Sequence, residues 1–214
     1  MKNLINLCAQ SFIPGLPFLD GQTFIREFKN LQIGQGPLKN VFTLHFPSFF
    51  CAIHESTKTH ANFVFIEQKE TIHFMLHLSD FQNSIGIDDK LYTFQTQDGD
   101  EKLLFVKEES DLTKYITERI KYRNGLGNKI NNVTKVKNTE VVSYKTKDIL
   151  SFYMNNYDRV QEKLEFNMIQ FKSIPSTNED LALYYNKNNR QLSFVVALPK
   201  EEEIEYFNFG HRIP

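Results

Sequence analysis

The stretch FVFIEQKETIHFMLHL, residues 63–78, decides the fold. Two runs of aromatic and aliphatic residues flank the polar tetrad QKET at residues 68–71. Runs of this kind favour strands, and a short polar segment between two of them is typical of a hairpin. Because side chains alternate along a strand, His73 and His77 share one face of the second strand. The stretch therefore predicts an antiparallel hairpin.

The same period of two extends around this hairpin, from residue 41 to about residue 107. On the N-terminal side, residues 41–46 and 49–53 both predict strand. Pro47 lies between them, and a proline within a strand favours an edge position or a bulge.

A second hairpin is predicted on the C-terminal side. Residues 91–95 and 103–106 are apolar runs that flank Asp98-Gly99-Asp100. The Asp-Gly pair is a strong signal for a tight hairpin turn. Together the runs predict an antiparallel meander of about five strands, since consecutive strands joined by short turns pair antiparallel.

The period changes after Ser110. Apolar residues then recur three and four positions apart, at Leu112, Tyr115, Ile116 and Ile120. This spacing predicts a short helix over about 111–124 whose apolar face packs on the core. Gly125 is the expected C-cap.

A long helix is predicted from about residue 148, because apolar residues recur at helical spacing from there toward Pro175. Residues 164–168 also alternate, so this part is either helix or strand. Residues 133–145, between the two helices, predict a strand.

The two ends of the chain contribute further elements. Residues 181–185 and 192–196 flank a polar turn and predict another hairpin, and residues 204–209 predict a last strand. Near the start, residues 13–21 predict a loop from their Pro and Gly content, and residues 24–28 fit either a helix or a strand.

The predicted fold class is therefore α+β, with a mainly antiparallel sheet of meander and hairpins, one short helix and one long helix. We expect a single domain over residues 1–214. If the chain has two lobes, these are about 1–125 and 126–214, divided in the glycine-containing segment 124–132.

Composition excludes several classes of protein. The chain has 214 residues, 41% of them hydrophobic, and a formal net charge of −1, which excludes a disordered chain. No run approaches the roughly 18 apolar residues of a membrane helix, and the N-terminal apolar stretch is too short and interrupted for a signal peptide. We expect a cytoplasmic protein with no membrane association, in which Cys8 and Cys51 are reduced and buried.

The small net charge hides a basic segment. Residues 1–110 carry a net charge of −4, residues 111–147 carry +6, and residues 148–214 carry −3. The candidate binding residues of the basic segment are Lys114, Arg119, Lys121, Arg123, Lys129, Lys135 and Lys137. Three tyrosines are interleaved with them, at Tyr115, Tyr122 and Tyr144. This pattern suits binding to a nucleic acid, another polyanion or an acidic protein. It is also typical of a solvated helix face beside an edge strand whose lysines prevent pairing with another chain.

The histidines do not predict a metal site. His73 and His77 lie about 13 Å apart on a strand, which is too far for one ion. A metal would need His45 or His54 from a neighbouring strand. We expect these histidines to lie on the polar face of a half-buried sheet, and we expect no cofactor.

A nuclease pattern is present in outline. Asp20 and the acid-x-Lys pair of Glu67 and Lys69 could hold Mg²⁺ beside an activated water, but Lys69 falls in the expected hairpin turn. Nucleophilic catalysis has no support, because the chain has no G-x-S-x-G elbow. Cys51, near His54 in a predicted strand, is read as a buried structural thiol. No catalytic residue is assigned.

These observations favour a non-catalytic protein-interaction module of the inhibitor, immunity or adaptor type. Segregated charge and surface aromatics would anchor its protein partner. One alternative is a nucleic-acid-binding or processing protein that uses residues 111–147. Others are a metal-dependent nuclease-like enzyme, or an enzyme whose active site is assembled from distant segments. The oligomeric state stays open.

Overall fold

The computed structural model describes residues 16–33, 36–82, 85–86, 88–97, 100–160, 162–200, 203–208 and 211–213. The helices are α2 (Phe18–Lys29), α3 (Phe46–Glu55), α4 (Thr113–Asn124), α5 (Leu126–Thr134), α6 (Thr146–Val160) and α7 (Glu179–Lys187). The strands are β1 (Gln32–Ile33), β2 (Gly36–Pro37), β3 (Val41–His45), β4 (His60–Gln68), β5 (Thr71–Ser79), β6 (Lys90–Gln97), β7 (Asp100–Glu109), β8 (Val141–Lys145), β9 (Lys163–Gln170), β10 (Leu192–Lys200), β11 (Glu203–Asn208) and β12 (His211–Ile213).

Ten of these strands form one sheet, in the order β11-β10-β9-β3-β7-β6-β5-β4-β8-β12, and β1 and β2 pair separately. Neighbouring strands in the large sheet are antiparallel except β3 and β7, which are parallel. The chain leaves β3 through α3, forms the meander β4–β7, and returns beside β3. The predicted α+β class is confirmed, but the sheet is mixed rather than a simple antiparallel meander.

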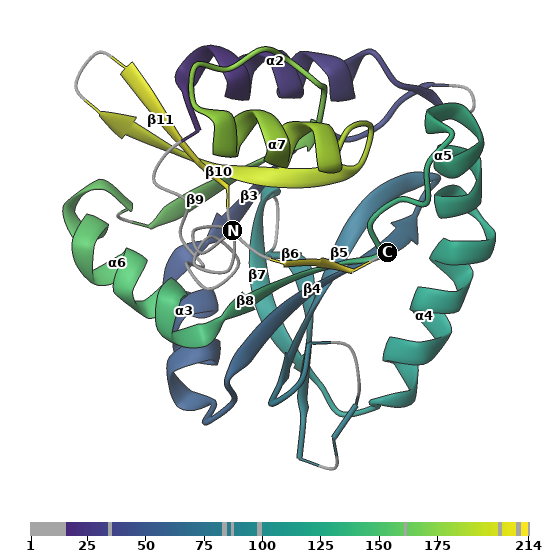
Figure 1. Ribbon diagram of the computed structural model, residues 1–214. Helices are drawn as coiled ribbons and strands as arrows, with labels where there is room; N and C mark the ends of the chain where they lie inside the picture. The colour runs from purple at the N-terminus through teal and green to yellow at the C-terminus, as the bar shows by residue number, and fades with distance from the viewer. Residues whose placement is uncertain are drawn as a thin grey trace.

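The sheet curls into a half-barrel (Figure 1). The rings of Phe63 in β4 and Phe194 in β10 have centroids 5.2 Å apart, although five strands separate β4 from β10 in the sheet order. In a flat sheet, six strand spacings of ~4.8 Å would hold these strands about 29 Å apart. The contact therefore requires strong curvature, and the inner face encloses the main aromatic core.

Helices cover both faces of the half-barrel. The inner cluster includes Phe46 and Phe49 of α3, Phe152 of α6 and Ile130 of α5. On the outer face, α4 covers the meander through Tyr115, while α2 and α7 cover β9 and β10. Figure 1 shows α3 and α6 on one side of the molecule and α4 and α5 on the opposite side.

The central hairpin β4–β5 confirms the prediction from residues 63–78. Its turn residues Lys69 and Glu70 have φ angles of 49° and 61°, and two consecutive positive φ values are typical of a type I′ turn. The pairing of β6 with β7 is confirmed as well. Asp98 and Gly99, the predicted turn between them, lie outside the described residues.

The strand predicted at residues 49–53 is wrong, because these residues belong to α3. The side chain of His45 accepts a hydrogen bond from the Ser48 N–H at 3.3 Å, and Pro47 lies in the first turn, where a helix tolerates proline. Phe46, Phe49 and Ile53 are buried and share one helix face at spacings of three and four. Helical burial of these side chains overrides their strand propensity.

The strand predicted at residues 181–185 is also wrong, because these residues lie in α7. The side chain of Asn178 caps the helix by accepting from the N–H groups of Asp180 and Leu181. Tyr185 is buried edge-on against Phe24 of α2, with ring centroids 4.9 Å apart. The partners of β10 are β9 and β11, so the predicted hairpin does not form.

The prediction of one short and one long helix gives too few helices, because the described residues contain six. The long helix is α6, which ends at Val160, and the ambiguous residues 164–168 are strand in β9. Residues 126–134 form α5, so the strand predicted at 133–145 shrinks to β8. Residues 24–28, left open between helix and strand, lie in α2.

Candidate interaction surfaces

The seven predicted cations of the basic segment lie on α4, on α5 and in the loop that follows α5. Three of them are held by carboxylates. Lys114 Nζ lies 2.6 Å from Glu109, and the guanidinium groups of Arg119 and Arg123 both bind Glu140. Lys121, Lys129, Lys135 and Lys137 are exposed.

Glu140 is a buried carboxylate that precedes β8 and binds two arginines of α4. Arg119 Nε donates to it at 2.9 Å, and Arg123 donates through two nitrogens at 2.7 Å each. Burial alone raises the pKa of Glu140, but the hydrogen bonds from Arg123 and Arg119 outweigh it and lower the pKa below its usual value. These two arginines therefore fix α4 to the sheet, and the carboxylate of Glu140 offsets one of their two positive charges.

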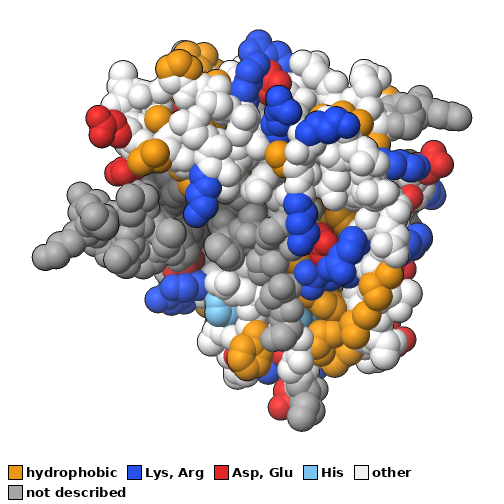
Figure 2. Space-filling view, turned by 45° about the vertical axis from the view of Figure 1, so that its right-hand side comes forward, with side chains coloured by type: hydrophobic (Ala, Val, Ile, Leu, Met, Phe, Trp, Pro, Cys, Tyr) orange, Lys and Arg blue, Asp and Glu red, His pale blue; other side chains and the backbone are white. Residues whose placement is uncertain are grey.

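The tyrosines interleaved with the cations are not available to a ligand. Tyr115, Tyr122 and Tyr144 are all buried, so they cannot act as stacking platforms for nucleic-acid bases, which single-strand binders commonly provide. The predicted orientation of α4 is also wrong in part. Ile116 and Ile120 are 52% and 47% exposed, because Tyr115 and Tyr122 occupy the face that packs on the sheet. Figure 2 shows Lys and Arg side chains beside a stripe of hydrophobic side chains on this side of the molecule.

The histidines do not lie on an exposed polar face, contrary to the prediction. His73 and His77 are buried, because the outer face of β5 is covered. Burial lowers the pKa of His73 to about 4. His45 caps α3 and stacks on Phe105 at 4.3 Å. Among the described residues, no group of three or more His, Cys, Asp or Glu side chains is placed to hold a metal ion.

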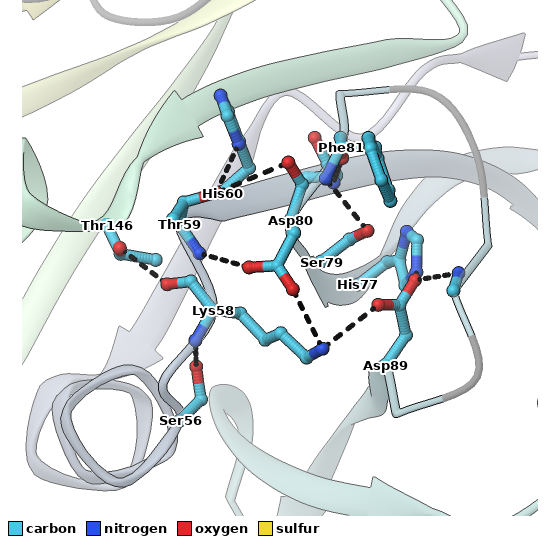
Figure 3. Close-up of polar contacts among 12 residues, drawn as sticks. Ser56, Lys58, Thr59, His60, His77, Ser79, Asp80, Phe81, Asp89 and Thr146 are labelled. Atoms are coloured by element: carbon cyan, nitrogen blue, oxygen red, sulfur yellow. Dashed lines mark hydrogen bonds and ion pairs between the residues drawn. The ribbon is translucent and has the colours of Figure 1, made fainter.

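His77 belongs to a polar cluster at the end of β5 (Figure 3). Its Nε2 lies 2.8 Å from Asp89, and Lys58 Nζ lies 3.1 Å from Asp80 and 3.6 Å from Asp89. Burial lowers the pKa of His77, although the contact with Asp89 opposes this. The cluster joins residues 58–60 and 77–80 to Gly86 and Asp89. The His77 ring is buried, so the cluster presents no reactive imidazole to the solvent.

The residues of the nuclease pattern have separate structural contacts. Glu67 accepts a hydrogen bond from the N–H of Leu126 at 2.8 Å, at the N-terminus of α5. Asp20 accepts one from the Tyr185 hydroxyl at 2.8 Å. Lys69 lies in the turn between β4 and β5.

The structure adds a surface that the sequence analysis missed, on α3 and α6. Rings follow one another across the two helices, with centroid distances of 5.6 Å from His54 to Phe50, 4.3 Å from Phe50 to Tyr153 and 5.3 Å from Tyr153 to Tyr157. Met154 and Tyr157 are 73% and 63% exposed. We call His54, Phe50, Tyr153, Met154 and Tyr157 the α3–α6 aromatic surface.

Cys51 is exposed on α3 beside this surface, so its predicted burial is wrong. One sequence signal could have revealed the surface. Residues 46–53 and 149–157 contain no Asp, Glu, Lys or Arg, although the chain as a whole is 24% charged. Two helical segments that reach the solvent without a charged residue are atypical of a purely solvated surface.

No protein-family model, curated protein or solved structure matches this chain. None of the helices in the described part of the chain combines the length and the apolar character needed to cross a lipid bilayer. Function is therefore inferred from the exposed surfaces themselves.

Proposed function

We propose that this protein is a non-catalytic protein-interaction module that binds its partner through the α3–α6 aromatic surface. The observation that supports this is the row of rings from His54 to Tyr157, ending beside the exposed Met154. Aromatic residues and methionine are enriched in the cores of protein interfaces, and charged residues are depleted there. Both features coincide on α3 and α6.

The contacts among the rings favour binding for a second reason. Tyr153 also stacks on the buried ring of Phe46, with centroids 4.9 Å apart, so the row is anchored in the core. Side chains already held in place lose little conformational entropy when a partner covers them. The surface thus presents rigid apolar anchors, which are typical of interface hot spots.

The test uses the full chain as bait in an extract of its own source, with the double variant Met154→Lys/Tyr157→Lys beside the wild type. Loss of a hot spot costs about 2 kcal/mol or more, which is about 30-fold in Kd. We expect a partner that wild type retains and the double variant loses. Leu183→Lys is the matched control, since Leu183 is an apolar residue on α7, outside this surface, that is 53% exposed. Retention of every partner by the double variant, or no partner at all, would contradict the proposal.

A second candidate function, binding of a nucleic acid, is favoured by the four exposed lysines at 121, 129, 135 and 137. No ion pair to these lysines is present among the described residues. Binding would then weaken steeply with salt, and Lys121→Glu/Lys135→Glu would abolish it, whereas Lys69→Glu in the β4–β5 turn would not. Absence of a gel shift at low salt would eliminate this function.

A further inference from the structure

A polar cleft opens where α2, the end of α5 and the end of β9 meet, with a volume of about 440 Å³. Its walls include Glu27 and Leu31 of α2, Thr134 of α5, and residues 170–173 and 189–190. Pockets that take small molecules have volumes of roughly 300–1,000 Å³. The cleft has room for a small organic molecule, and it shares no residue with the α3–α6 aromatic surface.

Arg190 is the cation of this cleft that lacks a carboxylate partner among the described residues. Its guanidinium donates to the carbonyl oxygen of Thr134 at 3.5 Å, which is a long hydrogen bond. Lys172, the other cation on the wall, lies 2.8 Å from Glu27 and is neutralised by it. The cleft therefore has a net positive wall.

The backbone holds Arg190 firmly at this position. Its φ of 68° is in the left-handed region, which is unfavourable for a residue other than glycine. The Arg190 N–H donates to the carbonyl of Phe171 at 2.7 Å, and the buried side chain of Gln170 donates to the Arg190 carbonyl at 3.2 Å. Strained backbone held by its surroundings is common at ligand-binding positions.

The rest of the wall suits an anion that carries an apolar body. Asn189 Oδ1 accepts from the Ser173 N–H at 3.1 Å, which leaves the Asn189 amide nitrogen as a neutral donor on the wall of the cleft. Leu31, Val133 and Phe171 supply apolar atoms. A guanidinium binds carboxylates and phosphates through two parallel hydrogen bonds.

We propose that this cleft is a binding site for a small organic anion, whose carboxylate or phosphate group pairs with Arg190 while its body packs against Leu31 and Val133. The site is independent of the protein-interaction surface on α3 and α6.

The test is a titration of the full chain followed by two-dimensional amide NMR, with phenyl phosphate, benzoate, inorganic phosphate and phenol as probes. We expect saturable shifts at the amides of Ser173, Asn189 and Arg190 with either aromatic anion, and at least tenfold weaker binding of phenol and of inorganic phosphate. Whichever of phenyl phosphate and benzoate binds more tightly identifies the anionic group.

Arg190→Gln should weaken binding of the better aromatic anion at least tenfold, and Arg190→Lys should weaken it less. Arg26→Gln, at an exposed position of α2 outside the cleft, is the matched control and should bind like wild type. The titration of the wild-type chain does not depend on any variant, so a folding defect in Arg190→Gln would leave its result unaffected. Absence of saturable shifts at the cleft, or equal binding of phenol and phenyl phosphate, would overturn the proposal.

Discussion

Acid should destabilise this protein through His73, and the replacement His73→Phe should remove that part of the pH dependence. Burial, with a contribution from the charge of Lys39, lowers the pKa of His73 from 6.5 to about 4 in the folded state. The unfolded chain therefore takes up a proton on this histidine more readily than the folded chain does. The stability that depends on neutral His73 is therefore fully present above pH 6.5, and it is lost as the pH falls toward 4.

The magnitude follows from the two pKa values. Each pKa unit corresponds to about 1.4 kcal/mol, so the protonation of His73 lowers the free energy of unfolding by about 2 kcal/mol at pH 5 and about 3 kcal/mol at pH 4, relative to pH 7.5. Phenylalanine keeps a ring against Phe42, whose centroid lies 5.6 Å from that of His73, and it cannot titrate. Stability should be measured by urea unfolding at several pH values between 7.5 and 4.5.

Comparing the two proteins cancels the effects of carboxylates and of the other histidines. Wild type should lose about 2 kcal/mol more than His73→Phe between pH 7.5 and pH 5. His54→Gln, at an exposed position on α3, should follow the wild-type profile. A gap between wild type and His73→Phe that stays constant over this pH range would refute the burial argument.

Three further substitutions test other parts of the structure. Glu140→Gln removes the carboxylate shared by two arginines and should lower the free energy of unfolding by about 2 kcal/mol, measured by urea unfolding. Gly125→Ala places a Cβ against the carboxylate that caps α5 and should lower the thermal midpoint by several degrees. Met154→Lys/Tyr157→Lys should change stability by less than about 0.5 kcal/mol per site; a larger loss would mean that the α3–α6 aromatic surface supports the fold rather than binding.

The elements that could be predicted from the sequence are those that depend on neighbours in the chain. The β4–β5 and β6–β7 pairs were predicted because each joins two alternating runs across a short turn. The helix α4 was predicted from its spacing and its glycine C-cap. In each of these elements, the residues that make the backbone hydrogen bonds are close along the chain.

The predictions of secondary structure were wrong where the local sequence pattern fits two structures. Short apolar runs such as residues 49–53 and 181–185 suit either a strand or a buried helix. Their state is decided by caps from His45 and Asn178 and by burial against distant partners. Likewise, the spacing of apolar residues on α4 could not decide between its isoleucines and its tyrosines, since the packed face depends on strand residues distant in the chain, such as Val64 and Ile66 of β4.

The candidate surfaces, too, could be predicted from the sequence only in part. The segregation of basic residues into 111–147 is a property of the sequence. Four of the seven candidate cations are exposed and have no ion pair among the described residues, as a ligand would require. The ion pairs of Arg119 and Arg123 with Glu140 could not be predicted, because Glu140 is not their neighbour in the sequence. The α3–α6 aromatic surface and the cleft at Arg190 each combine segments that only folding brings together.

The amino-acid sequence alone determined the α+β class, the central hairpins, the helical state of α4 and the uneven charge, because these follow from side-chain periodicity and turn chemistry within a few residues. Only the tertiary structure decided the parallel pair β3–β7, the curvature that brings Phe63 against Phe194, the burial of His73 and His77, and the aromatic rings that face outward. Those features are set by packing between segments far apart in the chain, and the free energy of that packing depends on the whole curled sheet.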